Sequence, residues 1–379
     1  MELNSKINEL INSGKDVINL TVGEPNYYEP SNAAHVAIEA INEHFTHYTS
    51  TPGILSLRQA IVKKLKEDNQ LDFSADQIVV SNGGKQALYN TLAVLLNEGD
   101  EVLIPTPAWP SYASQVELLD GVPKEIPLSE DTGFKLTPDL LEKNCSPKTK
   151  LIILNSPSNP TGATYTSAEF KALVPIIEKH KLLVISDEIY EKLVYDMDYV
   201  SPLNVSQYIR ENSILINGFS KAFGMTGWRI GYTAAPIEVS KKIAAFQSQT
   251  TANINSIAQK AAEVALANFE IQHVAELKRN RDILFKAIQE DTDMSLDDCP
   301  NGAFYLFPNI KGLIGKTYGG QEVHNSQDFC HILLKEAGIG ITPGDVFDAP
   351  NNVRISYAKD LQTIKTVRDR LISFFEGEN

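Results

Sequence analysis

The sequence predicts an α/β protein with a mostly parallel central sheet that is flanked by helices, followed by a smaller α+β domain. Three observations indicate this class. Short runs rich in β-branched residues alternate with helical stretches as far as about residue 216, and a long helical stretch from about residue 257 to 288 follows. The chain has 379 residues, which is long for a single core and suits one large and one smaller domain.

The expected elements follow in chain order. Residues 3–14 carry apolar residues at helical spacing and end at Gly14, which predicts an amphipathic helix. Apolar runs predict buried strands at residues 78–80, 101–104, 151–154, 182–185 and 214–216, with helices between several of them, such as 86–96 and 167–180. The chain closes with a predicted strand at 353–357 and a final helix.

The bulk composition excludes several classes of function. An apolar fraction of 42% and a charged fraction of 22% are those of an ordinary globular protein. The formal net charge of −14 argues against binding to nucleic acid or to anionic membranes, because both need a basic surface. Cys145, Cys299 and Cys330 are too few and too scattered for a disulfide framework or a zinc site, so no metal is expected. The N-terminus lacks a signal-like segment and no apolar run has membrane-spanning length, so we expect a cytoplasmic protein.

Lys221 is the most informative residue of the chain. It lies in the segment 217–232, after the apolar run at 214–216 and among small and apolar neighbours. A buried ammonium without a partner is costly, and a desolvated amine is suited to form a Schiff base with a carbonyl cofactor. Arg229 adds, eight residues on, a fixed cation that is able to grip a phosphate through two donors.

Two further motifs follow predicted strands, at the edge of the sheet where ligands bind in such folds. Gly83 and Gly84 come after the strand at 78–80 and precede a helix, an arrangement that favours an anion, although glycine pairs at such turns are often purely steric. Asp187 comes after the strand at 182–185; a carboxylate there is able to pair with a heterocyclic nitrogen, and Tyr190 with a ring oxygen. An acidic helix start is the alternative interpretation of Asp187.

Two loops complete the set. Asn159, in the Pro-rich segment 155–162, carries a free side-chain amide in a tight loop. Trp109 follows the strand at 101–104, where its ring is able to stack on a flat cofactor or simply to pack. An amine, an acid for a ring nitrogen, a phenol, a stacking ring, an amide and a phosphate cup together indicate pyridoxal 5′-phosphate as the cofactor.

The chain also resembles a known family. Segments 81–88, 155–162, 186–191, 220–232 and 353–358 are similar, in order, to those of the class I/II aminotransferases of the fold type I pyridoxal-phosphate family. The likeness is greatest to the bacterial aspartate/aromatic aminotransferase branch, because of Gly-Gly-Lys-Gln-Ala-Leu at 83–88 and Ser-Asp-Glu-Ile-Tyr-Glu at 186–191. We therefore expect an N-terminal arm over residues 1–30 that packs with the small domain, a large cofactor-binding domain over 31–274, and a small domain over 275–379.

The resemblance implies a role for each matching residue. Lys221 would bind the cofactor as a Schiff base, Asp187 would pair with the pyridine nitrogen, Tyr190 and Asn159 would contact the ring oxygen, and Trp109 would stack on the ring. The phosphate would be held by Gly83, Gly84, Ser220 and Arg229, and by Tyr48 from the neighbouring subunit of a homodimer with shared active sites. Gly23 would line the substrate site and Arg354 would bind the substrate α-carboxylate. Gly218 stands where many members carry a hydroxyl, and the segment before the first helix is short.

The implied activity is transfer of an amino group from an L-amino acid to a 2-oxo acid such as 2-oxoglutarate, by a ping-pong mechanism. Lys85 lies beside the phosphate cup, either as a further phosphate contact or solvated helix start, or as the partner of a substrate's distal carboxylate. The second role predicts an acidic donor such as aspartate, with an aromatic donor as secondary.

A pyridoxal-phosphate-dependent carbon–sulfur lyase is the alternative enzyme, and would release pyruvate and ammonia without an oxo-acid acceptor. A cofactor-sensing regulator is the non-catalytic alternative, but it would need a DNA-binding domain for which the short, acidic N-terminus has no room.

Overall fold

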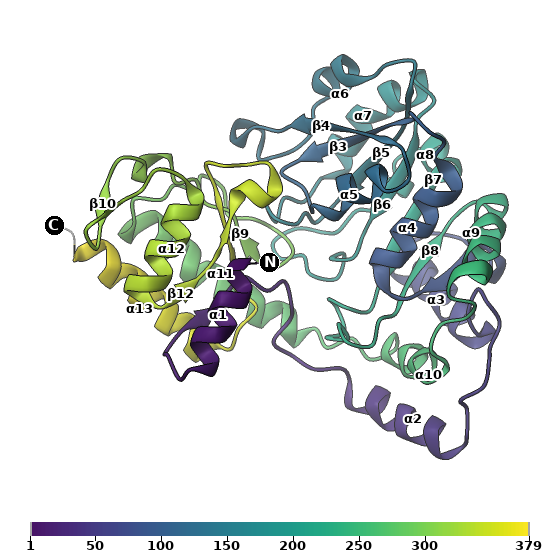
Figure 1. Ribbon diagram of the computed structural model, residues 1–379. Helices are drawn as coiled ribbons and strands as arrows, with labels where there is room; N and C mark the ends of the chain where they lie inside the picture. The colour runs from purple at the N-terminus through teal and green to yellow at the C-terminus, as the bar shows by residue number, and fades with distance from the viewer. Residues whose placement is uncertain (1, 378–379) are drawn as a thin grey trace.

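A seven-stranded sheet forms the centre of the larger part of the computed structural model, which describes residues 2–377 (Figure 1). All neighbouring strands are parallel except those next to β8, which runs antiparallel to both of its neighbours. The strands, in their order across the sheet, are β2 (Ile78–Ser81), β8 (Gly231–Ala234), β7 (Ser213–Gly218), β6 (Leu183–Asp187), β5 (Thr149–Asn155), β3 (Glu101–Thr106) and β4 (Val122–Pro127). The predicted fold class is confirmed.

Helices cover both faces of this sheet because successive strand residues point to opposite sides. On β5, Leu151 and Ile153 pack with the apolar residues of α4 and α5, whereas Ile152 and Leu154 pack with those of α6, α7 and α8. The helices of this part are α2 (Ser31–Asn42), α3 (Leu55–Asn69), α4 (Gly83–Leu95), α5 (Ser111–Glu117), α6 (Pro138–Asn144), α7 (Ser167–Lys179), α8 (Gln207–Glu211), α9 (Ile237–Thr250) and α10 (Ser256–Ala265).

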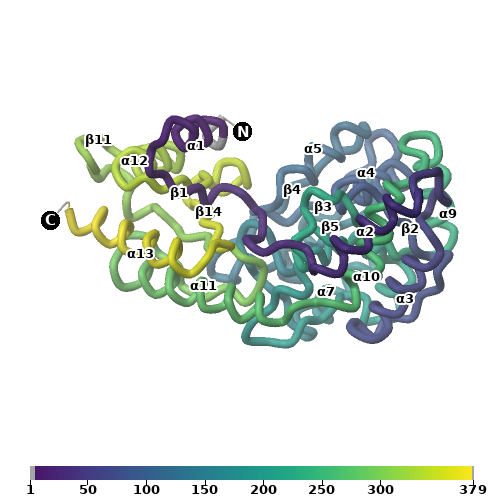
Figure 2. The backbone as a smooth tube through the Cα atoms, turned by 90° about the horizontal axis from the view of Figure 1, so that it is seen from below, coloured from purple at the N-terminus to yellow at the C-terminus, as the bar shows by residue number. Residues whose placement is uncertain are grey.

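The smaller part has its own apolar core and contains both α1 and α13 (Figures 1 and 2). β13, β14 and β9 form an antiparallel sheet, and β1 pairs in parallel with β12, so that Ile18 lies beside Ile339. The elements are α1 (Glu2–Asn12), β1 (Ile18–Asn19), α11 (Gln272–Asp291), β9 (Tyr305–Leu306), β10 (Thr317–Tyr318), β11 (Gln321–Glu322), α12 (Ser326–Ala337), β12 (Ile339–Gly340), β13 (Thr342–Pro343), β14 (Val353–Ser356) and α13 (Leu361–Glu376).

Two expectations about elements need correction, and two strands of the large sheet were missed. The helical stretch expected from 257 to 288 is two helices, α10 and α11, because the chain turns at 266–271. There Phe269 packs against Phe223, and the Asn268 side chain donates to the carbonyl of Val264. The helix expected from residue 86 begins at Gly83. Strands β4 and β8 were not among the predicted strands.

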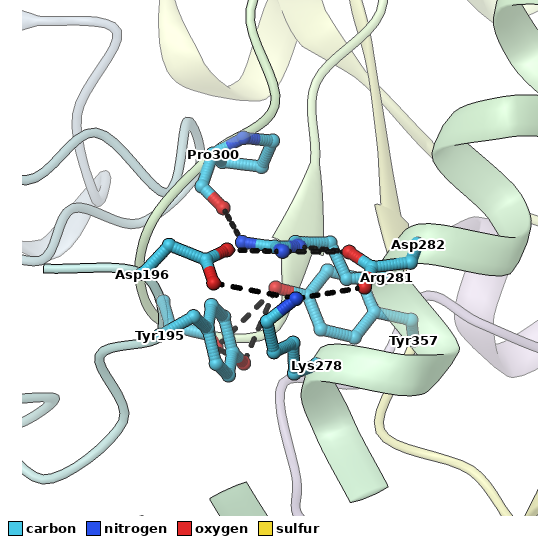
Figure 3. Close-up of polar contacts among 8 residues, drawn as sticks. Tyr195, Asp196, Lys278, Arg281, Asp282, Pro300 and Tyr357 are labelled. Carbon is cyan, nitrogen blue, oxygen red and sulfur yellow. Dashed lines mark hydrogen bonds and ion pairs between the residues drawn. The ribbon is translucent and has the colours of Figure 1, made fainter. Parts of the chain in front are cut away.

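An ion-pair cluster around the buried Arg281, whose partners are about half exposed, joins α11 to the loop after β6 (Figure 3). The Arg281 guanidinium, with a side chain only 2% exposed, lies 2.7 Å from Asp196 and 2.6 Å from Asp282, and donates to the carbonyl of Pro300 at 2.9 Å. Lys278 lies 3.3 Å from the same Asp196. The cluster therefore links the loop to the helix by charge as well as by packing. Within residues 2–377, no helix is long and apolar enough to cross a membrane.

Candidate active site

The carboxyl ends of the parallel strands open into a cavity of about 360 Å³. Asn155 ends β5 and lies opposite Asp187, the last residue of β6, so that two polar side chains meet at one edge of the sheet. Most of the predicted site residues line this cavity: Gly23, Gly84, Lys85, Trp109, Asn159, Asp187, Tyr190, Ser220, Lys221, Arg229 and Arg354. Two predicted residues do not line it. Gly83 lies directly behind Arg229, and Tyr48 is 92% exposed.

Lys221 reaches into the cavity from the turn after β7. Its Nζ donates to the carbonyl of Gly23 at 2.6 Å, and its backbone carbonyl accepts from the hydroxyl of Tyr27 at 2.7 Å. Burial of the amine, together with the nearby positive charges of Arg354 and Arg229, lowers the pKa of Lys221 to about 8. A larger share of this amine is therefore in the neutral, nucleophilic form near neutral pH than for an ordinary lysine.

Asp187 is a buried carboxylate held in place by hydrogen bonds. The hydroxyl of Tyr112 donates to Oδ2 at 2.7 Å, and the backbone N–H of Ile189 donates to Oδ1 at 3.2 Å. Burial raises the pKa of Asp187 above its ordinary value, and this effect exceeds the lowering by the two donors and by the charge of Lys221. A protonated ring nitrogen beside Asp187 would offset the cost of burying this charge. Tyr112 was not predicted as a site residue, although it lies three residues after Trp109 in the same segment.

The two neighbouring acids after β6 have different surroundings. Asp187 lines the cavity, whereas Glu188 is fully buried and accepts from Ser186 at 2.9 Å and from Ser201 at 2.7 Å. Residues 189–192 form turns and no helix follows β6 there, so the helix start considered as an alternative for Asp187 is wrong. The alternation of side chains along a strand explains why one acid faces the ligand space and the next faces the core.

The phosphate cup forms where α4 approaches the segment after β7. Gly83 has a φ of +80° and begins α4, and a Cβ at this position would overlap the Arg229 guanidinium. A Cβ at Gly231 would in turn overlap the backbone of Gly83 and Gly84. Only glycines permit this close approach, which leaves the N-terminus of α4 and the Arg229 cation beside the same space. Such a space suits a phosphate group.

Arg354 on β14 brings the smaller part of the chain to the cavity. Its Nη1 donates to the side-chain oxygen of Asn159 at 2.9 Å, and its Nη2 donates to the carbonyl of Thr21 at 2.6 Å. The sequence predicted a free Asn159 side-chain amide, and this prediction is only half right. The amide oxygen accepts from Arg354, whereas the NH₂ group remains for a ligand. Arg354 Nε is buried without a hydrogen-bond partner within residues 2–377. The site thus presents an arginine whose bonds all go to neutral oxygens.

Lys85 and Trp109 form one wall of the cavity. The Lys85 ammonium lies 4.9 Å from the centre of the Trp109 ring, and the two side chains line the cavity together. Trp109 also packs edge-on against Tyr112, with 5.4 Å between the two ring centres. No carboxylate of the part of the chain that the structure describes forms an ion pair with Lys85.

The charges of the cavity fit an anionic ligand. Its lining contains four cationic side chains and only one carboxylate, in a chain whose formal net charge is −14. The cations are Lys85, Lys221, Arg229 and Arg354, and the carboxylate is that of Asp187. The buried acid, the desolvated amine, the aromatic wall and the glycine-walled cup fit pyridoxal 5′-phosphate. An α/β enzyme that binds this cofactor is the class that the fold and the site define.

Comparison with known proteins identifies the family. The profile of the family "Aminotransferase class I and II" matches residues 15–371, so the chain belongs to this family and is a pyridoxal-phosphate-dependent aminotransferase. The aspartate/prephenate aminotransferase of Cereibacter sphaeroides is 41% identical, over 98% of this chain and 94% of the relative. The aspartate aminotransferase of Geobacillus stearothermophilus is 40% identical, over 100% of this chain and 96% of the relative.

Solved structures agree with this assignment. The crystal structure of the aspartate aminotransferase from Rhizobium meliloti superposes with a TM-score of 0.94 at 35% identity, covering 99% of this chain and 95% of that one. The Thermus thermophilus aspartate aminotransferase with maleate superposes with a TM-score of 0.91 at 34% identity, covering 98% and 95%. The predicted family, enzyme class and cofactor are therefore confirmed.

Proposed function

We propose that this aminotransferase prefers an acidic amino donor such as aspartate, with 2-oxoglutarate as an acceptor and an aromatic amino acid as a secondary donor. When bound, pyridoxal phosphate supplies a sink for the electrons of the substrate Cα–H bond. Gly84, Ser220 and Arg229 would hold its phosphate, with Gly83 directly behind Arg229. Asp187 would hold its pyridine nitrogen, and Tyr190 with the Asn159 NH₂ group its ring oxygen. Trp109 would stack on its ring.

Lys221 is the proposed base. Its amine, with a pKa of about 8, is partly neutral at neutral pH and would accept the substrate's Cα proton at Nζ. Arg354 binds the substrate α-carboxylate, and Gly23 lines the same side of the cavity. Fixing the α-carboxylate orients the Cα–H bond toward Lys221, so that this bond is the one that breaks.

The preference for an acidic donor depends on one observation, which is that Lys85 is a cavity cation without a carboxylate partner in the described chain. In this proposal Arg229 would be engaged by the phosphate and Arg354 by the α-carboxylate. The distal carboxylate of aspartate or glutamate then needs a cation in the same closed space, because an unpaired charge is costly there. Several relatives that match along nearly the whole chain are named aspartate aminotransferases, which supports this proposal.

The Lys85→Ser variant tests the proposal in single-turnover half-reactions, where the donor reacts without 2-oxoglutarate and the change in cofactor absorbance is followed. We expect the apparent second-order rate constant with aspartate to fall roughly 30- to 300-fold, as for loss of a charge-paired contact, and that with phenylalanine to change less than about threefold. Lys63→Ser, a change at an exposed lysine of α3, is the matched control. An equal loss for both donors would assign Lys85 to the cofactor and would refute the acidic preference.

We also propose a homodimer in which Tyr48 serves the neighbouring subunit's phosphate site. Tyr48 is 92% exposed, and Ile38, Ile41 and Leu55 of the adjoining segments are 57%, 52% and 54% exposed. An apolar surface of this kind suits burial against a second copy, and two-fold dimers are the commonest closed assemblies. Light scattering at assay concentration should give twice the chain mass of 41.9 kDa. A fully active monomer would contradict the proposal.

A further inference from the structure

Tyr305 is a cavity residue that sequence reasoning did not select. It lies on β9, whose antiparallel pairing with β14 places it opposite Ser356. Arg354 lies two residues before Ser356, so Arg354 and Tyr305 share one face of this small sheet. The Arg354 guanidinium lies 4.6 Å from the centre of the Tyr305 ring.

The Tyr305 hydroxyl lies 2.9 Å from the hydroxyl of Tyr190, which follows β6 of the large sheet. The two side chains are 0% and 3% exposed. This hydrogen bond therefore joins the smaller part of the chain to the large sheet inside the cavity. A Cβ at Gly23 would overlap the Tyr305 hydroxyl, so the glycine beside Lys221 also makes room for this contact.

The direction of the hydrogen bond follows from the chemistry of the two phenols. Each hydroxyl carries one proton, so a Tyr190 that donates to a ligand oxygen must accept from Tyr305. The positive charge of Arg354 over the Tyr305 ring makes that phenol the better donor. A hydroxyl that accepts one hydrogen bond donates a second more strongly, because the chain of dipoles is cooperative.

We propose that Tyr305 is a positioning residue that holds Tyr190 as a hydrogen-bond donor to the ring oxygen of the cofactor. This inference rests on the proposed roles of Tyr190 and Arg354. It assigns to a residue of the smaller part, which also carries the substrate-binding arginine, control over the electronic state of the cofactor. The expected consequence is a property of the bound cofactor itself, namely the pH at which its visible absorption band titrates.

The test compares Tyr305→Phe, Tyr190→Phe and the double variant, each loaded with pyridoxal phosphate and titrated without substrate. A donor to the ring oxygen stabilises its negative charge and lowers the basicity of the Lys221–cofactor linkage, so its loss raises the titration midpoint. We expect a rise of about half a pH unit to one pH unit for Tyr305→Phe and a larger rise for Tyr190→Phe. The double variant should match Tyr190→Phe alone, since Tyr305 acts through Tyr190.

Tyr357→Phe is the matched control. Tyr357 is another fully buried tyrosine of the smaller part, its hydroxyl donates to Tyr195 at 3.3 Å, and it does not line the cavity. Its midpoint should equal that of the parent enzyme. If Tyr190→Phe raises the midpoint and Tyr305→Phe does not, the Tyr305 inference is refuted and the proposed role of Tyr190 stands. If neither variant moves the midpoint, both fail.

Discussion

Two buried arginines of the smaller part of the chain have opposite environments. Arg281 on α11 is 2% exposed and lies between the carboxylates of Asp196 and Asp282 (Figure 3). Arg354 on β14 is 7% exposed, and its hydrogen bonds go to the neutral oxygens of Asn159 and Thr21. Aromatic rings lie against each of them, at 4.9 Å from Tyr195 for Arg281 and at 4.6 Å from Tyr305 for Arg354.

The difference separates an arginine whose charge is already paired from one whose charge is available to an anion. A buried guanidinium is tolerated when carboxylates or good acceptors compensate for its lost hydration. Arg281 has that compensation within the protein, so its charge is satisfied before any ligand arrives. Arg354 has acceptors but no counter-ion in residues 2–377, and one of its nitrogens has no acceptor. In the proposed role of Arg354, a substrate carboxylate would supply the missing charge.

The largest expected effect is the loss of kcat/KM in the Arg354→Gln variant. Loss of a charge-assisted bidentate partner for the α-carboxylate should lower kcat/KM for aspartate by roughly a thousandfold, about 4 kcal/mol. The free energy of unfolding of the substrate-free enzyme should change little or increase, because an uncompensated buried charge is removed. Steady-state kinetics and urea unfolding measure the two quantities. A large loss of stability with normal kcat/KM would reverse the comparison.

A smaller effect, on stability instead of catalysis, is expected for Arg281→Met. The variant keeps much of the side-chain volume but removes the ion pairs and the bond to Pro300, so the free energy of unfolding should fall by about 2 kcal/mol. The kcat/KM of the folded enzyme should stay within about threefold of the parent value. Asp196→Asn, at a carboxylate whose side chain is 49% exposed, should cost less than about 1 kcal/mol. A catalytic loss larger than the stability loss in Arg281→Met would show that the cluster serves the site.

The sequence was most informative where a residue's chemistry conflicts with its surroundings. Lys221 among apolar neighbours and Asp187 at a strand end were selected from local sequence, and they line one cavity with Arg229. Arg354 was selected only through resemblance to the family, because an arginine in a short β-branched run has no local signal for a ligand. The division into arm, large domain and small domain stays a prediction, as do the individual residue roles.

Tyr112 and Tyr305 were missed for a physical reason. A tyrosine in an apolar segment is usually a packing residue, and the hydroxyl's partner decides whether it does more. For Tyr112 that partner is Asp187, which lies 75 residues away in sequence, and for Tyr305 it is Tyr190, 115 residues away. No pattern of local spacing carries information about such pairs.

The sequence by itself determined the alternation of strands and helices, the glycine pair at the start of α4 and the chemical types of the predicted site residues, because these depend on local periodicity and on the properties of single side chains. Tertiary structure alone decided that β8 runs antiparallel, that the chain turns between α10 and α11, and which arginine is already neutralised. Each of these outcomes depends on contacts between segments far apart in the chain. Burial and pairing create the difference between Arg281 and Arg354, two residues that are chemically identical in the sequence.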